Sequence, residues 1–370
     1  MNKLNAAESL RGLACIAVVF SHFLGVFFPQ LHSFYVSSLP EYDIAKFFYN
    51  SPFSFFYSGT GAVFVFFVLS GYVLTFSFMK TNDRVRKFKE SLVKRYPRLA
   101  IPAVLSCILM CAVFYIPIDL SNVSEWFRGV RPNDFSFFGA IYSGLIGSFI
   151  FGDKTYNPVL WTMQIELLGS LIIYLLCFSF ENKRNMVLIL ILSLLFSFYI
   201  SPLVFLGVFS FLIGFCIYFF NFSLGKVLSC FLLLLGIYFC GVHNNSFSYG
   251  FLSYYFKHYT YFVFNFFGGV LIVFTVLKSQ FIQDNLDNKF LVKLGELSFS
   301  IYLSHLFVMY LFGVPLFNLF YKLTDGFLFS SFISIVFSLF VTYFFSVFYS
   351  KYVDQKSINI SNYLAKKFVN

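Results

Sequence analysis

Long runs of apolar residues, separated by short polar segments, dominate this chain. A helix needs about 20 apolar residues to cross roughly 30 Å of hydrocarbon. The pattern predicts ten such spans, of which 186–200 and 227–242 are short for a crossing. The ten spans are 11–29, 60–79, 99–118, 157–180, 186–200, 202–220, 227–242, 260–277, 297–314 and 327–350.

An eleventh apolar segment, 136–151, is short and rich in Gly and Ser, which favours a re-entrant or interfacial position. The sequence contains no visible repeat, linker or polar stretch that would form a soluble domain. We therefore predict a single integral-membrane domain over residues 1–370. Its fold class is all-α, a polytopic membrane bundle of about ten transmembrane helices.

Composition and charge support a membrane protein and predict its orientation. The chain is 59% hydrophobic and only 11% charged, whereas about a quarter of the residues in a soluble protein are charged. If the N-terminus is cytoplasmic, 20 of the 26 Lys and Arg residues fall on the cytoplasmic side, as the positive-inside rule requires. The net charge of +10 therefore reports topology and not nucleic-acid binding. We predict a multi-pass protein of the cell (inner) membrane with both termini cytoplasmic.

The cysteines and the N-terminus narrow the remaining possibilities. All seven cysteines lie in or beside apolar runs, as small buried side chains do, so we expect neither a disulfide framework nor a metal site. The first run resembles a secretory signal, but it contains His22 and lacks a small-residue cleavage site. We interpret it as an uncleaved first helix. The aromatic outer loop 29–59 is either a lid over a site or an interfacial aromatic belt.

Ionisable side chains inside a bilayer are costly and usually face a cavity or a partner. Away from helix ends the predicted spans contain three: His22, Glu166 and His305. Arg11 precedes His22 by 11 residues, close to three helical turns and a rise of about 16 Å, so both lie on one helix face. This spacing fits a ligand with an anionic end, a thin arm and a reactive end, such as a coenzyme A thioester. The alternative for His22 is a structural hydrogen bond between helices.

Glu166 and His305 are the other two candidates. Glu166 is predicted about 13 Å below the outer start of its helix, near the depth of His22, where a carboxylate would orient the imidazole. Its alternative is a structural acid bonded to a neighbouring hydroxyl. His305 is predicted to lie below His22, with Tyr302 and Ser298 beneath it at helical spacing. The alternative for His305 is a packing role.

Two further stretches carry candidate residues. "RVRKFKESLVKRYPRLAIP", residues 84–102, places Arg95 and Arg98 beside a predicted helix start, where guanidinium groups suit phosphates. Its alternative is an ordinary basic cytoplasmic loop. "FFVLSGYVL", residues 66–74, supplies Ser70 and Gly71, small residues that let helices approach closely.

Five motifs together resemble the acyltransferase 3 family, integral-membrane acyltransferases that modify cell-surface sugars. They occur in family order over nearly the whole chain. They are Arg11 followed after ten residues by His22, "FFVLSGY", "KRYPRLAIP", "LWTMQIE" (residues 160–166) and "GELSFSIYLSH" (residues 295–305). The family often has "LWSL" where this chain has Leu160, Trp161, Thr162 and Met163.

The resemblance implies a ten-helix bundle that takes an acyl group, commonly acetyl, from cytoplasmic acyl-CoA and delivers it to a hydroxyl outside. It makes His22 the essential histidine and Arg11 its partner, and it places Arg95, Arg98 and Glu166 at further motif positions. Many relatives carry an extracytoplasmic esterase-like domain after the last span. Only about 20 residues follow that span here, so either a second transfer step would need another protein or the helix bundle completes the transfer alone.

The expected function is therefore transfer of acetyl from acetyl-CoA to a sugar hydroxyl of a surface polysaccharide, glycolipid or lipid-linked precursor, in the lipid bilayer. We expect His22 and Glu166 to be catalytic. The residues expected to bind the acyl-CoA are Arg11, Arg95, Arg98, Ser70, Tyr302 and His305. His22 acts either as a general base on the acceptor hydroxyl or as a transient acyl carrier. Two other classes compete with this function: a transporter or flippase for lipid-linked sugar, and a structural membrane subunit. The lack of a visible internal sequence repeat argues against a transporter.

Overall fold

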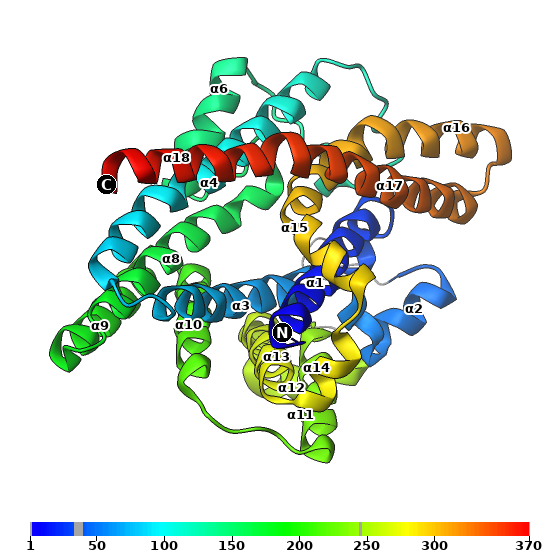
Figure 1. Cartoon of the computed structure of the whole chain (residues 1–370). Coiled ribbons are helices and arrows are strands. Elements are labelled where there is room, and N and C mark those ends of the chain that lie inside the picture. Colours follow the sequence, from blue (N-terminus) through cyan, green and yellow to red (C-terminus); the bar gives the residue numbers. More distant parts are fainter. Residues whose placement is uncertain (1, 33–39, 244–245, 370) are drawn as a thin grey trace.

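The computed structural model describes residues 2–32, 40–243 and 246–369. It is 84% helical without strands in this part, which confirms the predicted all-α membrane bundle. Nine helical segments of the described residues are long and apolar enough to cross a membrane (Figure 1). Their main helices are α1 (Asn2–Phe27), α3 (Gly59–Met79), α4 (Arg84–Phe114), α8 (Thr162–Phe178), α9 (Lys183–Ile200), α10 (Pro202–Phe219), α13 (Thr260–Lys278), α15 (Lys289–Val308) and α17 (Phe327–Tyr349).

Shorter helices join these spans or extend them. They are α2 (Asp43–Asn50), α5 (Glu125–Arg128), α6 (Phe137–Tyr142), α7 (Ser148–Ile150), α11 (Lys226–Cys240), α12 (Gly250–Phe256), α14 (Gln280–Leu286), α16 (Val314–Thr324) and α18 (Gln355–Val369). The predicted short segment 136–151 becomes α6, a π-helical turn (Ser143–Gly147) and α7, packed against α4 and α8. We call the end of the bundle where α1 begins proximal and the end where α1 finishes distal.

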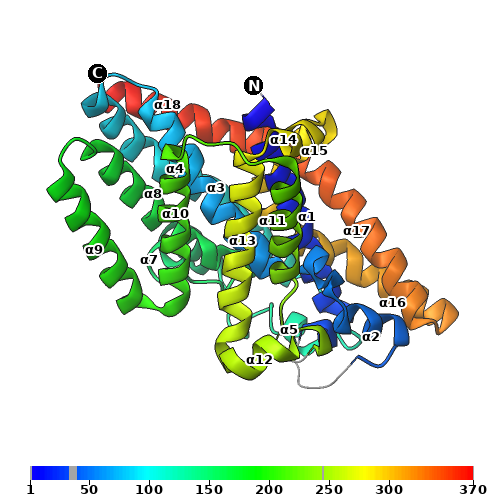
Figure 2. The same ribbon diagram turned by 90° about the horizontal axis from the view of Figure 1, so that it is seen from below.

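The predicted span 227–242 forms α11, which is 15 residues long. This is about 22 Å, short of the hydrocarbon thickness of about 30 Å. Nevertheless α11 runs beside α13 in the opposite direction (Figure 2). Leu224, before α11, donates its N–H to the carbonyl of Lys278 at the end of α13, and Asn265 in α13 donates to the carbonyl of Val242 after α11. The alternation of directions implied by ten spans is thus kept.

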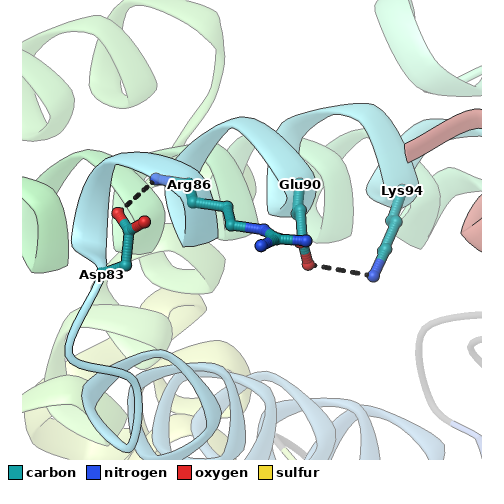
Figure 3. A network of polar contacts seen from close by, with 4 residues as sticks. All are labelled: Asp83, Arg86, Glu90 and Lys94. Carbon is teal, nitrogen blue, oxygen red and sulfur yellow. Dashed lines mark hydrogen bonds and ion pairs between the residues drawn. The ribbon is translucent and has the colours of Figure 1, made fainter. Parts of the chain in front are cut away.

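Helix α4 begins 15 residues before the predicted span 99–118. It covers 31 residues, because polar contacts stabilise its first turns. Asp83 Oδ1 accepts the N–H of Arg86 at 2.9 Å, and Glu90 pairs with Arg86 at 3.1 Å and with Lys94 at 3.2 Å (Figure 3). Caps and pairs three or four residues apart favour the helix even where it is solvent-exposed.

The expectation that this helix starts near residue 99, just after Arg95 and Arg98, was therefore wrong. Pro97 and Pro102 both lie inside α4, where the packing of this helix against α18, α8 and the π-helical turn offsets the proline cost. Arg95 and Arg98 consequently project from a continuous helix and not from a loop. A continuous helix fixes the spacing of these two guanidinium groups.

The interior of the bundle is built around α1, α3 and α15. Helix α1 packs against both α15 and α3, as Figure 1 shows. The segment Lys289–Thr324, which contains α15, has 83% of its apolar stretch buried, whereas α9 has only 11%. Helix α15 is thus a core helix, and α9 presents most of its surface to lipid. Polar residues on α1 and α15 are therefore enclosed by protein.

The last span continues through a π-helical turn (Ser350–Asp354) into α18. Figure 1 shows α18 lying across α4 near the C-terminus. Its buried side consists of the small residues Ser357, Ser361 and Ala365, which allow the two helices to approach closely. The residues after the predicted last span are thus a helix that braces the proximal part of α4.

Candidate active site

Helices α1 and α15 cross where two glycines meet. A Cβ on Gly12 would lie 2.9 Å from the backbone nitrogen of Gly295, and a Cβ on Gly295 would lie 2.0 Å from the carbonyl oxygen of Glu8. Side chains larger than hydrogen therefore do not fit, as is typical of close helix pairs in membranes. His22 follows Gly12 by ten residues, and His305 follows Gly295 by ten. Both histidines accordingly lie about 15 Å beyond the crossing.

These two histidines form a pair within the bundle. His22 Nδ1 lies 2.8 Å from His305 Nε2, with the rings at an interplanar angle of 11°. His305 is completely buried, and His22 is half-buried. The expectation that His305 lies below His22 was wrong, because α15 begins at Lys289 and not at 297.

A third contact fixes the tautomers of the pair. His305 Nδ1 lies 3.1 Å from the carbonyl oxygen of Ile301. A carbonyl only accepts, so His305 carries its proton on Nδ1 and presents a lone pair at Nε2. His22 must then donate from Nδ1, which leaves the lone pair of His22 on Nε2. His305 thus orients His22 as a carboxylate orients the histidine of a hydrolytic triad.

Trp126, which the sequence reasoning did not select, stacks on His22. Their ring centroids are 5.6 Å apart with an interplanar angle of 13°. The tryptophan lies on α5, whose N-cap Ser124 accepts the N–H of Phe127 at 3.2 Å and donates its own N–H to the carbonyl of Val26 at 2.8 Å. The available signal was a tryptophan, one of only two in the chain, in a polar loop between spans. Trp126 covers the imidazole from the distal loop.

Glu166 belongs to a second polar cluster, formed with residues of α3 and α4. Its Oε1 accepts a hydrogen bond from Ser70 Oγ at 3.0 Å, and its Oε2 pairs with Arg95 Nη2 at 2.6 Å. The carboxylate thus contacts Arg95 and Ser70, and the position beside His22 Nδ1 is taken by His305. The hypothesis that Glu166 orients His22 is replaced by this pairing, whereas the alternative of a hydroxyl-bonded acid matches Ser70.

Three arginines gather toward the proximal end. Arg98 is exposed and interacts electrostatically with Arg95, Arg11 and the acid Asp354. Arg11 pairs with Glu8 at 3.0 Å, one turn away on its own helix. Arg95 Nε is buried and has no hydrogen-bond partner among the residues that the structure describes. A buried N–H without a partner is costly, so this donor is suited to an acceptor atom of a ligand.

Tyr302 connects α15 to the start of α8. Its hydroxyl donates to the carbonyl of Val159 at 2.9 Å and lies 3.1 Å from Thr162 Oγ1. Asn157 Nδ2 also donates to the carbonyl of Leu303 at 2.9 Å. The "LWTM" motif thus docks directly on the turn of α15 that precedes His305. In this arrangement Tyr302 bonds to protein groups, and it remains a prediction that it contacts an acyl-CoA.

Part of the predicted lid, residues 33–39, lies outside the described residues; the rest forms α2 and a 3-10 helix (Pro52–Tyr57) at the distal end. His243 Nε2 contacts the carbonyl of Tyr49 at 3.0 Å, and Ser248 Oγ donates to the carbonyl of Asn50 at 2.5 Å. These contacts join α2 to the segment after α11. Burial lowers the pKa of His243 and that of His32 to about 4.

The fold and site define a multi-pass helical membrane protein with a buried histidine pair and an arginine cluster at its proximal end. No group of three or more His, Cys, Asp or Glu within the described ranges is placed to hold a metal ion. The acyltransferase domain model of the acyltransferase 3 family matches residues 4–351. The chain therefore belongs to this family and is a membrane acyltransferase. Comparison with curated proteins and with solved structures gave no match.

Proposed function

We propose that this acyltransferase takes an acetyl group from cytoplasmic acetyl-CoA and delivers it across the membrane to a hydroxyl of a surface polysaccharide or lipid-linked sugar. The proposal assigns the proximal end to the cytoplasm, in line with the predominance of Lys and Arg in the loops of that side. One observation carries it: the contacts of the histidine pair leave the Nε2 lone pair of His22 available as a base.

The arginine cluster supports an anionic donor. Arg11, Arg95 and Arg98 bring three guanidinium groups together. Glu8 pairs with Arg11, Glu166 pairs with Arg95, and Asp354 interacts with Arg98, but Arg95 Nε keeps a buried N–H without a partner among the described residues. Guanidinium groups bind phosphates through paired N–H donors. Arg11 lies about 16 Å along α1 from His22. A donor whose phosphates bind this cluster would extend its thioester along α1 toward the imidazole.

The chemistry follows from the tautomer. His22 Nε2 removes the proton of the acceptor hydroxyl while its oxygen attacks the thioester carbonyl carbon. The new C–O bond forms, the C–S bond breaks, and the proton passes from the imidazole to the CoA sulfur. His305 accepts the Nδ1–H of His22 throughout, so the developing imidazolium keeps its partner.

A transient acyl-histidine would use the same nitrogen. In that route Nε2 attacks the thioester, CoA leaves, and the acceptor hydroxyl then takes the acyl group from the imidazole. The two routes differ in one measurable way. Only the second leaves an acetyl group on His22 when acetyl-CoA is supplied without an acceptor, which mass spectrometry of rapidly quenched protein detects.

The test uses purified protein in lipid nanodiscs with acetyl-CoA labelled in the acetyl group. We expect release of free CoA and transfer of the label to glycan in a membrane extract. His22→Ala should abolish both while the protein remains folded and inserted. His258→Ala, an exposed histidine at the distal surface, serves as the matched control and should behave as wild type.

Two outcomes would overturn the proposal. If the His22→Ala variant transfers label at the wild-type rate, the imidazole is not the reactive group. If the wild-type protein neither consumes acetyl-CoA nor releases CoA, but moves lipid-linked sugar between leaflets, the chain acts as a flippase.

A further inference from the structure

A separate cavity of about 170 Å³ lies at the distal end of α1. It is partly open, and it is lined by residues from the end of α1, the 3-10 turn Pro29–Leu31, the start of α2 with the residues just before it, and the first residue of α17. This volume is below the 300–1,000 Å³ typical of sites for drug-sized ligands. The cavity therefore suits a single small unit.

Aromatic residues from three segments line this cavity. The rings of Tyr42 and Phe327 are nearly parallel, with an interplanar angle of 11° and centroids 6.3 Å apart. Phe28 stands edge-on to both, at 77° to Tyr42 and 87° to Phe327. Because these contacts hold the rings against one another, the aromatic surface is already formed in the absence of a ligand.

Two polar side chains complete the lining. Gln30 is half-buried and Glu41 is exposed at the rim. Neither side chain makes a hydrogen bond or an ion pair within the described part of the chain. The Gln30 amide can donate and accept hydrogen bonds, and the Glu41 carboxylate can accept them. The combination is unsuited to a lipid tail, which would leave these groups unsatisfied, and to a phosphate, which the carboxylate would repel.

We propose that this cavity is a binding site for one sugar ring of an extended acceptor glycan. A pyranose presents C–H groups on its faces and hydroxyls around its edge. Aromatic surfaces pack against the C–H faces; the Gln30 amide exchanges hydrogen bonds with the hydroxyls, and the Glu41 carboxylate accepts hydrogen bonds from them. The inference rests on the proposed function, which brings a glycan to the distal side.

The position of the cavity separates it from the reactive site. Phe27, at its edge, follows His22 by five residues, a rise of about 7.5 Å and a rotation of about 140° around α1. The cavity therefore opens on another side of the helix from the imidazole. It would hold a neighbouring sugar of the same glycan while the reacting hydroxyl reaches His22.

The test measures binding independently of transfer. Saturation-transfer NMR on the full protein in nanodiscs would use the methyl glycosides of glucose, galactose, mannose, rhamnose and N-acetylglucosamine as probes. We expect at least one glycoside to bind the wild-type protein. Its signal should fall at least fivefold in Tyr42→Ala and in Glu41→Gln. Asp43→Asn changes a neighbouring acid that is 97% exposed and pairs with Lys46, and it should leave the signal unchanged.

The outcomes distinguish this inference from the proposed function. Absence of binding by every glycoside, or equal binding by wild type and both variants, overturns the sugar site. Binding of tetramethylammonium that depends on Tyr42 also overturns it, because it assigns the cavity to a cationic lipid headgroup. CoA release from acetyl-CoA, measured in the same preparations and dependent on His22, tests the proposed function separately.

Discussion

Replacing His305 tests the central argument, that this residue acts by holding His22 in one tautomer. His305→Leu fills the fully buried site with an apolar side chain and removes the acceptor 2.8 Å from His22 Nδ1. The Nδ1–H of His22 then lacks its partner, at a cost of about 1–3 kcal/mol. Since about 1.4 kcal/mol corresponds to tenfold in rate, we expect kcat/KM to fall about 5- to 150-fold.

A second variant separates orientation from packing. His305→Gln places an amide oxygen near the position of the imidazole Nε2 and restores an acceptor for His22. We therefore expect this variant to lose less than about tenfold in kcat/KM. Both variants would be assayed for CoA release, with melting temperatures recorded for the same preparations.

Two results would refute this reasoning. If His305→Leu keeps full activity, His22 does not need an acceptor on Nδ1. If the Leu and Gln variants are equally impaired at unchanged melting temperature, His305 acts through its volume or as a catalytic base itself.

Three other perturbations test the surrounding structure. Gly295→Ala would place a Cβ 2.0 Å from the backbone of Glu8 and force α1 away from α15. Because an offset of about 1 Å can cost a hundredfold in rate, we expect a large fall in kcat. The control is Gly225→Ala, whose Cβ would meet nothing within 4 Å, and its kcat should fall far less. Arg95→Ala should lower the free energy of unfolding by about 3 kcal/mol, because the Glu166 carboxylate, which is only 15% exposed, loses its partner. In thermal melts, the double variant Arg95→Ala with Glu166→Gln should recover part of this loss. Burial lowers the pKa of His243 from 6.5 to about 4. The stability is therefore highest above pH 6.5, and about 3 kcal/mol of it is lost as the pH falls toward 4. His243→Gln should make the melting temperature depend less steeply on pH across that range, and the remaining dependence includes that of His32, whose pKa is also about 4.

The sequence predicted the membrane class and the first helix well. Hydropathy depends on the residues themselves, so runs of 20 apolar residues identify spans without knowledge of their neighbours. The face shared by Arg11 and His22 follows from helical geometry alone and needs only an unbroken α1, which the structure provides. The beginning of α4 was missed because caps and charge pairs extend a helix beyond its apolar part.

Lateral neighbours could not be predicted in this way. Glu166 and His22 were placed at similar depth, but depth does not determine which helices touch. In the structure Glu166 contacts Arg95 and Ser70. His22 contacts His305 and Trp126 instead. Trp126 lies on a short distal helix that is held by long-range contacts, among them the hydrogen bond from Ser124 to the carbonyl of Val26 and the packing of Phe127 against Tyr310. No local pattern encodes such contacts.

The crossing of α1 and α15 explains how His305 is kept at the same level as His22. Arg11 is adjacent to Gly12, so the guanidinium lies in the same layer as Gly295. Both helices then run ten residues to the histidine layer, about 15 Å further on. Because the two helices run in the same direction from a shared contact, a shift of α15 along α1 would break the glycine contact and the histidine pair together. The depth at which His305 meets His22 is therefore set by one tight backbone contact between the helices, whereas the distance from Arg11 to His22 is set by α1 itself.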